Sequence, residues 1–302
     1  MKSLKNLVIR LVILPLLLLG LMASAQETAN RFFYELSFKP KKDSARIDKV
    51  MTILDIKKDK SIYQDFTVPA QDSIIKKTVE DMEKSGTFTD ITKIVKMPKF
   101  NYRIHKTYPS MKELFMDAIN NKFFGFEEEI KFDWKILADK EKIGTYNTQK
   151  ATTEFGGRKW TAWFSTDIPF QDGPYKFYGL PGLIVKIEDE GKNYSWLLSG
   201  NKKIDNYSER SESEKIQEKY GVSYTPTITS REKFEKSYAA YKKDPLAEIR
   251  PYLTQETMNK PMPGGNMTVG EFFKNQEKIA KDFFNANDNP IEINPTLDPK
   301  KK

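Results

Sequence analysis

Cysteine is missing from all 302 residues, and histidine occurs once, as His105. The first absence excludes disulfides, thiolate metal sites and thiol catalysis. The second excludes a metal site with two histidines, and no neighbouring residues indicate a Ser-His-Asp arrangement. Stability must therefore come from a packed core, to which aromatic residues at 13% of the chain can contribute. We expect no cofactor, and we expect His105 to be a partly exposed strand residue.

Long apolar runs are missing beyond the first 25 residues. Basic residues at positions 2, 5 and 10 precede an apolar stretch over 11–22, and Ala23-Ser24-Ala25 follows it. This order is typical of a secretory signal peptide with a small-residue cleavage site. The stretch is shorter than the ~20 residues that a membrane helix needs. We expect residues 1–25 to be a signal peptide, the mature chain to have no transmembrane span, and the protein to be exported to the periplasm or cell envelope, or secreted.

A large excess of one charge is also missing, since the formal net charge is +8 with 30% charged residues. Nucleic-acid binding requires lysine and arginine gathered on one face with stacking aromatics, and no such cluster is visible. We therefore expect no nucleic-acid partner. The partners left open are an apolar ligand, a peptide or an outer-membrane protein.

Glycine and proline are concentrated in one stretch of the chain. Gly173-Pro174 predicts one corner, and Gly179-Leu180-Pro181-Gly182 predicts a type II turn, because proline presets φ and glycine accepts a positive φ. Leu183, Val185 and Ile187 then alternate as one face of a strand. Two bends therefore hold Tyr175, Phe177 and Tyr178 between them. The stretch is interpreted either as a folding corner or as a contact surface.

This stretch resembles the GLPGLI family of bacterial envelope proteins, named for the residues that stand here as Gly179-Leu180-Pro181-Gly182-Leu183-Ile184. The resemblance extends to an ending, Asn289-Pro290-Ile291-Glu292, and to upstream residues: Gln149-Lys150-Ala151-Thr152, Phe155-Gly156-Gly157-Arg158, Trp160, Ala162-Trp163 and Ile168-Pro169. It implies an exported envelope protein. The family has no settled biochemical role, so the resemblance implies no reaction.

The hydrophobic periodicity predicts an antiparallel, bent meander sheet. Period-two alternation predicts strands over 32–38, 50–56, 62–66, 100–106, 113–119, 122–130, 145–155, 158–166, 183–188 and 194–198. Gly156-Gly157 predicts a hairpin turn inside a meander over 133–205. A helix is expected over 72–85, with Asp72 or Ser73 as its cap and Gly86 as its stop.

Capping boxes at Thr229 with Glu232 and at Thr268 with Glu271 predict two C-terminal helices. The fold class is therefore α+β, with a half-barrel-like sheet. After the signal peptide we expect a β-rich domain over 26–205, a helical region over 206–284 packed on it, and an extended or disordered tail over 285–302.

The candidate ligand site is aromatic. Trp160 and Trp163 are expected on opposite faces of one strand, because an odd offset reverses the side chain. Together with Tyr175, Phe177, Tyr178 and Trp196 they could line an apolar groove on the concave face, or form a purely structural core. The first interpretation predicts a non-enzymatic binding or accessory protein.

The alternative is a hydrolase whose site is built from carboxylates such as Asp133, Glu188 or Asp189. Other patterns have simpler interpretations. The Ser-x-x-Lys matches at Ser73 and Ser230 are explained by chance or helix capping, and Glu127-Glu128-Glu129 by a solvated strand edge.

Methionine offers one further hypothesis. Met258, Met262 and Met267 could bind Cu(I) through their thioethers, or could fill gaps beneath a loop.

Overall fold

The computed structural model describes residues 27–120, 122–219, 221–263 and 267–293. The expected signal peptide and the last nine residues of the expected tail lie outside these ranges. No helix in the described ranges is both long and apolar enough to cross a bilayer.

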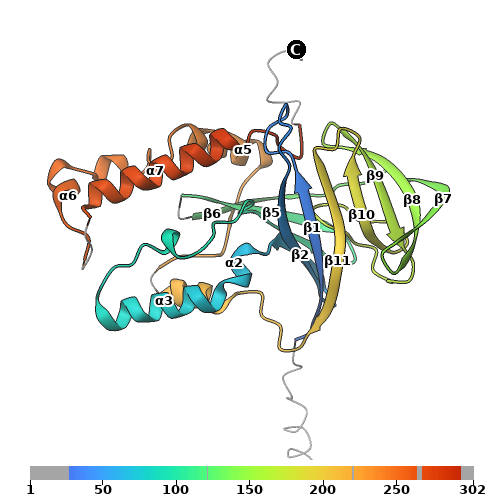
Figure 1. Cartoon of the computed structure of the whole chain (residues 1–302), viewed down its shortest axis with the longest axis horizontal. Helices are drawn as coiled ribbons and strands as arrows, with labels where there is room; N and C mark the ends of the chain where they lie inside the picture. The colour runs from blue at the N-terminus through green and yellow to red at the C-terminus, as the bar shows by residue number, and fades with distance from the viewer. Residues whose placement is uncertain (1–26, 121, 220, 264–266, 294–302) are drawn as a thin grey trace, which may run out of the picture.

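A twelve-stranded sheet, open at both ends, organises the molecule (Figure 1). Its first run of strands is β1 (Ala29–Phe38), β2 (Asp48–Ile56), β3 (Lys60–Asp65), β4 (Arg103–Thr107), β5 (Lys112–Ile119) and β6 (Lys122–Glu128). Its second run is β7 (Lys135–Ile143), β8 (Tyr146–Phe155), β9 (Arg158–Ser165), β10 (Leu183–Asp189) and β11 (Tyr194–Ile204). Neighbours within each run pair antiparallel, which confirms the predicted meander and the α+β class.

The two runs are joined by pairing between β1, the first strand of the first run, and β11, the last strand of the second run. β1 lies between β2 and β11, so the spatial order is β12-β6-β5-β4-β3-β2-β1-β11-β10-β9-β8-β7. The short β12 (Thr227–Ile228) pairs parallel to β6. Gly156 and Gly157, with φ of 60° and 78°, form the predicted β8–β9 turn, where Phe155 lies opposite Arg158. Positive φ at both central residues is what a type I′ turn requires.

Six helices lie in the described part of the chain: α2 (Thr67–Ala70), α3 (Asp72–Ser85), α4 (Glu212–Lys219), α5 (Arg231–Lys243), α6 (Gln255–Asn259) and α7 (Val269–Ala286). In Figure 1, α5 and α7 lie above the β5–β6 hairpin and α3 lies below it, while β7–β10 form the opposite side of the molecule. Sequence analysis did not predict α2, α4, α6, β7 or β12.

The predicted helix over 72–85 is confirmed, and it stops at Gly86 in the left-handed conformation. Its predicted cap is wrong, because Gln71 occupies that position. The Asp72 carboxylate instead accepts hydrogen bonds from the backbone N–H groups of Glu212 and Ser213, at 3.0 and 2.8 Å. Asp72 therefore caps α4, a helix distant in sequence.

The two predicted capping boxes have different outcomes. Thr268 and Glu271 form the predicted box at the start of α7. At α5 the cap is Ser230, whose hydroxyl accepts from Lys233 N–H, so the box at Thr229 is wrong and the capping interpretation of Ser230 is confirmed. Thr229 instead donates its backbone N–H to Gly125 O and extends the pairing beside β6.

The core fills the concave face of the sheet. Alternate residues of β1 (Phe32, Tyr34, Leu36 and Phe38) pack there against Trp160, Trp196, Phe177 and the last residues of the described chain. Fully burying one large apolar side chain contributes about 2–3 kcal/mol. Smaller clusters join α3 to α4 through Ile75, Val79 and Ile216, and join α5 to the sheet through Phe234.

Candidate functional site

The segment between β9 and β10 turns back onto the concave face of the sheet. Asp172 is buried there and accepts a hydrogen bond from Lys106 of β4, whose ammonium also donates to Gly173 O at 2.8 Å. Ser61 donates to the same carboxylate at 2.6 Å, and Tyr108 donates to it as well. These contacts anchor the segment that carries the glycine-proline bends.

The second bend is tighter than predicted. Gly182 N–H donates to Leu180 O at 2.8 Å, which is the i to i+2 bond of a γ-turn centred on Pro181, and Leu183 N–H donates to Ile168 O. The predicted type II turn is therefore wrong. A Cβ at Gly182 would lie 2.1 Å from Ser165 O, so the close approach of two backbones requires glycine here.

The six predicted ligand-binding rings separate into two environments. Trp160, Tyr175, Phe177 and Trp196 are buried in the core, and Tyr178 is half-buried. Trp163 lies on the opposite face of β9, as predicted, with the Lys150 ammonium 5.9 Å from its ring centroid. Of the six, Tyr175 lines one of the two cavities described below. A ligand-binding role stays a prediction for all six.

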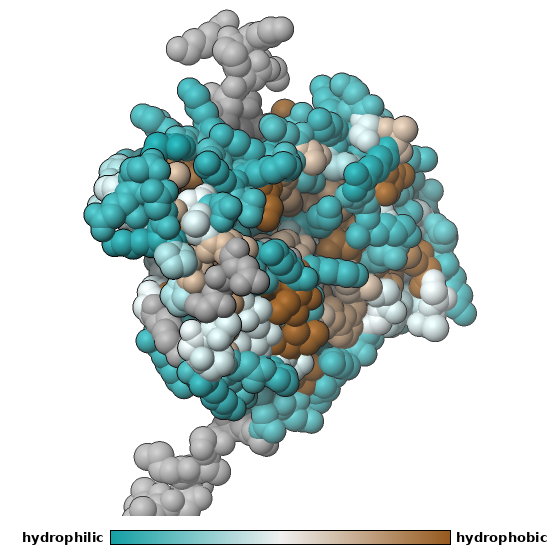
Figure 2. All heavy atoms as spheres, turned by 60° about the vertical axis from the view of Figure 1, so that its left-hand side comes forward, coloured by the Kyte–Doolittle hydropathy of each residue, from teal (hydrophilic) through white to brown (hydrophobic). Residues whose placement is uncertain are grey.

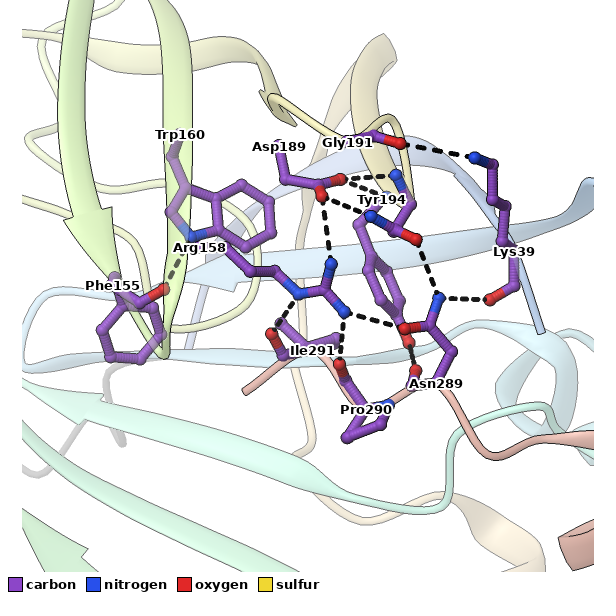
Figure 3. Close-up of polar contacts among 11 residues, drawn as sticks. Lys39, Phe155, Arg158, Trp160, Asp189, Gly191, Tyr194, Asn289, Pro290 and Ile291 are labelled. Carbon is purple, nitrogen blue, oxygen red and sulfur yellow. Dashed lines mark hydrogen bonds and ion pairs between the residues drawn. The ribbon is translucent and has the colours of Figure 1, made fainter. Parts of the chain in front are cut away.

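The chain after α7 forms a strap across the concave face (Figure 3). We use the name strap for residues 287–293. Arg158 Nη2 donates to Asn289 Oδ1 and to Pro290 O, both at 2.8 Å, and Arg158 Nε donates to Ile291 O at 2.8 Å. On the other side, Asn289 Nδ2 donates to Lys39 O at 3.0 Å. The strap fixes the C-terminal end of α7 to the sheet, and so determines where that helix lies.

Glu292 of the strap enters a buried cluster of charges. Lys176 Nζ lies 2.7 Å from Glu292 and is hydrogen-bonded to Glu128 of β6. Arg231 of α5 bridges the same two carboxylates, at 2.7 and 3.0 Å. The ion pairs with Lys176 and Arg231 lower the pKa of Glu292 despite its burial. The solvated-edge interpretation is therefore wrong for Glu128, because strand alternation turns it inward to these two cations.

A groove of about 620 Å³ runs between α7, α5, α4 and the ends of β4 to β6. Rings form much of its lining: Phe100, Tyr102, Phe123, Tyr224, Tyr238, Tyr241, Phe272, Phe273, Phe283 and Phe284. Figure 2 shows apolar surface in the hollow between the helical parts, with hydrophilic surface along its rims. Sequence analysis missed this site. The aromatic residues that recur at helical spacing along α7 were the signal that could have predicted it.

A second cavity of about 430 Å³ adjoins the groove on the side of the strap. The two share six lining residues: Phe100, Asn101, Tyr102, Tyr238, Phe283 and Phe284. The second cavity is more charged, since Asp117, Lys176, Arg231, Lys242 and Glu292 also line it. Burial raises the pKa of Asp117 to about 7.

The carboxylates of the predicted hydrolase are held apart from this site. Asp189 is buried and accepts from Arg158 Nη1 at 3.0 Å, from Asn193 N at 2.6 Å and from Tyr194 N at 2.7 Å. Glu188 pairs with Lys186 at 3.0 Å, and Asp133 is exposed. None of the three lines either cavity described here.

The remaining candidates are the single histidine and the three methionines. His105 is partly exposed on β4, as predicted, and burial lowers its pKa to about 4. Within the described residues no cluster of three or more histidines or carboxylates could hold a metal ion. Met262 N–H donates to Met267 O at 2.9 Å across the loop before α7. Copper binding by the three methionines stays a prediction.

Comparison with known proteins supports a family relationship over a small part of the chain. A family model described as "Protein of unknown function (Porph_ging)" matches residues 156–186, which include the Gly156-Gly157 turn and the stretch Gly179–Ile184. Membership of the GLPGLI family stays a prediction. No curated protein matches the chain.

Among solved structures, two crystal forms of PNGF-II are similar to this chain, with TM-scores of 0.47 and 0.46 at 15% and 16% identity. Each match covers 70% of this chain. The chain spans about a third of the length of PNGF-II, 32% and 33% in the two forms.

Proposed function

We propose that the protein is an exported binding protein of the cell envelope, which holds a small, mostly apolar ligand in the groove without transforming it. The observation that carries this proposal is the aromatic groove of about 620 Å³. Sites for small molecules are typically concave, about 300–1,000 Å³ in volume, and lined by apolar and aromatic side chains with a few polar groups. The groove has this size and this lining.

The apolar face of α7 supports the same conclusion. Phe272, Phe273, Ile279 and Phe283 recur at helical spacing and line the groove. An amphipathic helix normally buries such a stripe against its own protein. Here Gly270 is the one α7 residue that is buried, and Ile279 is 44% exposed. A ligand in the groove would remove this apolar surface from water.

The hollow shape of the site favours a small ligand over a folded protein partner. The groove is lined by the ends of β4 to β6 and by residues of α4, α5 and α7. A folded partner presents a broad surface, whereas an extended apolar molecule can enter a groove between helices and strand ends. Binding rather than hydrolysis is favoured because Asp133, Glu188 and Asp189 lie away from this site.

Binding of N-phenyl-1-naphthylamine tests the proposal, because this probe fluoresces in apolar surroundings. Ala280→Trp should fill the groove, since Ala280 lines it. Ala286→Trp is the matched control on the same helix, because Ala286 is exposed and lines neither cavity. We expect saturable binding to the wild type and to the control, and binding about tenfold weaker to Ala280→Trp.

Circular dichroism and urea unfolding should show that both variants are folded. Absence of saturable probe binding, or equal binding by the two folded variants, would overturn the proposal.

Export is tested separately by the N-terminal sequence of the protein recovered from cell fractions. We expect it to begin at Gln26 in the envelope or periplasmic fraction.

A further inference from the structure

The boundary between the two cavities contains a buried hydroxyl with no hydrogen-bond partner among the described residues. It belongs to Tyr102, which is 9% exposed and lines both cavities. Its ring packs against Phe100, Phe115 and Tyr175, with centroids 5.2 to 5.7 Å away, so the side chain is held in place. Buried polar groups in proteins nearly always have a partner. A ligand atom that accepts a hydrogen bond would supply one.

A cation without a described acidic partner lies in the second cavity. Lys242 is in the last turn of α5, and its ammonium lies 5.4 Å from the Tyr238 ring centroid and 5.8 Å from that of Phe284. In the described part of the chain it forms no ion pair within 4.0 Å, although Asp117 and Asp288 act on it at longer range. Desolvation lowers its pKa. Lys242 is also exposed, so an anion in the cavity can reach its ammonium.

The other cations of this cavity are already paired. Lys99 lies 3.4 Å from Asp48, Lys176 lies 2.7 Å from Glu292, and Arg231 Nε lies 2.8 Å from Glu235. Their charges are therefore largely neutralised within the protein. Lys242 is left as the group best able to receive a negatively charged atom from a ligand.

The apolar groove and this polar cavity adjoin at Tyr102 and Tyr238. Resting on the function proposed above, we propose that the ligand is a single-chain amphiphile with an acidic head group. Its alkyl chain lies along the groove between α7 and the ends of β4 to β6. Its head lies in the second cavity, where it accepts hydrogen bonds from the Tyr102 hydroxyl and the Lys242 ammonium.

Asp117 is the group that opposes an acidic head. It lines the same cavity, and burial raises its pKa to about 7. Below that pH most of it is uncharged, so the head would meet the positive charge of Lys242 with Asp288, but not Asp117, as a negative charge acting on that lysine. The inference therefore applies most strongly in mildly acidic solution.

Displacement of N-phenyl-1-naphthylamine at pH 6.5 tests the inference with ligands of equal chain length. Dodecanoate, dodecyl phosphate, dodecanol and dodecylamine are compared below their micellar concentrations. We expect at least one of the two acidic ligands to displace the probe at a concentration about tenfold lower than dodecanol, and dodecylamine to be weakest. The ratio of dodecanoate to dodecyl phosphate distinguishes a carboxylate head from a phosphate head.

Two variants locate the head group. Tyr102→Phe removes one hydroxyl, and Lys242→Met removes one charge while keeping an apolar stem. Each should reduce the preference for the acidic ligand towards the value for dodecanol, while dodecanol itself is unaffected. Lys243→Met is the control, because Lys243 is exposed on the same turn, as Lys242 is, but lines neither cavity.

The outcomes separate this inference from the proposed function. Equal displacement by acidic and neutral ligands would overturn the acidic head group. A preference for the acidic ligand that persists in both Tyr102→Phe and Lys242→Met would do the same. Neither result would contradict the proposed apolar site. Absence of probe binding to the wild type overturns both. A preference lost in the two variants and kept in Lys243→Met supports the inference.

Discussion

Arg158 Nη2 donates to Asn289 Oδ1 at 2.8 Å, and this contact joins the start of β9 to the strap. The same guanidinium reaches Asp189 and the carbonyls of Pro290 and Ile291. One side chain therefore satisfies several polar groups of a segment 131 residues away in sequence. It connects the glycine turn of the β8–β9 hairpin, the meander and the end of α7.

Replacing Arg158 with methionine should lower the free energy of unfolding by about 3 kcal/mol, because it leaves Asp189 in a buried site without its cation. We expect the lower end of the range for breaking a buried ion pair. Asn193 and Tyr194 still donate to the Asp189 carboxylate. Urea unfolding measures the change.

Arg46→Met is the control for Arg158→Met. Arg46 also pairs with an aspartate, Asp48, but its side chain is 68% exposed. Exposed pairs contribute less than about 1 kcal/mol. Equal losses in the two variants would contradict the role assigned to Arg158.

Gly182→Ala should prevent normal folding or lower stability severely. A Cβ at this position would lie 2.1 Å from Ser165 O, and φ is +158°. Because the obstacle is backbone, no side-chain movement can relieve it. Gly200→Ala is the control, since a Cβ there meets nothing within 4 Å. We expect thermal unfolding of Gly200→Ala within a few degrees of the wild type, and soluble Gly182→Ala with wild-type unfolding would refute the close-approach argument.

Glu113 should make stability fall as pH rises. Burial raises its pKa to about 8, with Lys106, Lys176, Glu128 and Glu292 as the charges around it. Both of its oxygens are buried without a hydrogen-bond partner in the described structure. The folded state therefore binds a proton that the unfolded state releases above about pH 4.5. The stabilisation from this proton is complete below that pH and is lost as pH rises towards 8.

Glu113→Gln removes this titration. The free energy of unfolding of the variant should rise relative to the wild type by up to about 1.4 kcal/mol per pH unit between pH 5 and 8. Urea unfolding at several pH values measures the difference. Parallel curves for the two proteins across this window would show that Glu113 does not titrate there.

Asp117 should make binding of the acidic amphiphile weaken above about pH 7, because its carboxylate then becomes negative beside the head group. Tyr238 and Lys242 act on Asp117 directly. The other charged or titratable residues that line the same cavity come from α5, from the segment before β10, from the strap, from β11 and from the segment before β4: Arg231, Glu235, Tyr175, Lys176, Asp288, Glu292, Tyr194, Lys99 and Tyr102. Loss of charge on Lys242 would act in the same direction. Dodecanoate displacement of the naphthylamine probe at pH 6 and pH 8 measures the combined effect.

Asp117→Asn isolates the carboxylate. It should remove the part of the decline centred near pH 7 and leave any decline due to Lys242 at higher pH. An unchanged profile in the folded variant would show that Asp117 does not face the head group.

Much of the architecture could be predicted because it depends on local pattern. Period-two alternation located ten of the twelve strands, Gly156-Gly157 located a hairpin, and Gly86 located the end of α3. Each of these signals acts between residues close in sequence. The pairing of β1 with β11 has no such signal, because it is decided by the shared core of two meanders.

The site could not be predicted for the same reason. Its polar residues, Tyr102, Asp117 and Lys242, come from separate parts of the chain and line one cavity only in the folded protein. The segment expected to be a tail gave no periodic signal, yet Asn289 and Ile291 are buried in the folded chain. Asp72 is a smaller example of a contact between distant parts of the chain. The sequence correctly predicted that it caps a helix, but the helix is α4 and not α3.

The hydrogen bond from Asn289 to Lys39 spans 250 residues. During synthesis, the strands near the N-terminus are made long before the strap that covers their concave face. Until the strap binds, the apolar surface on that face stays exposed, so the core is complete only when Asn289 and Ile291 are in place.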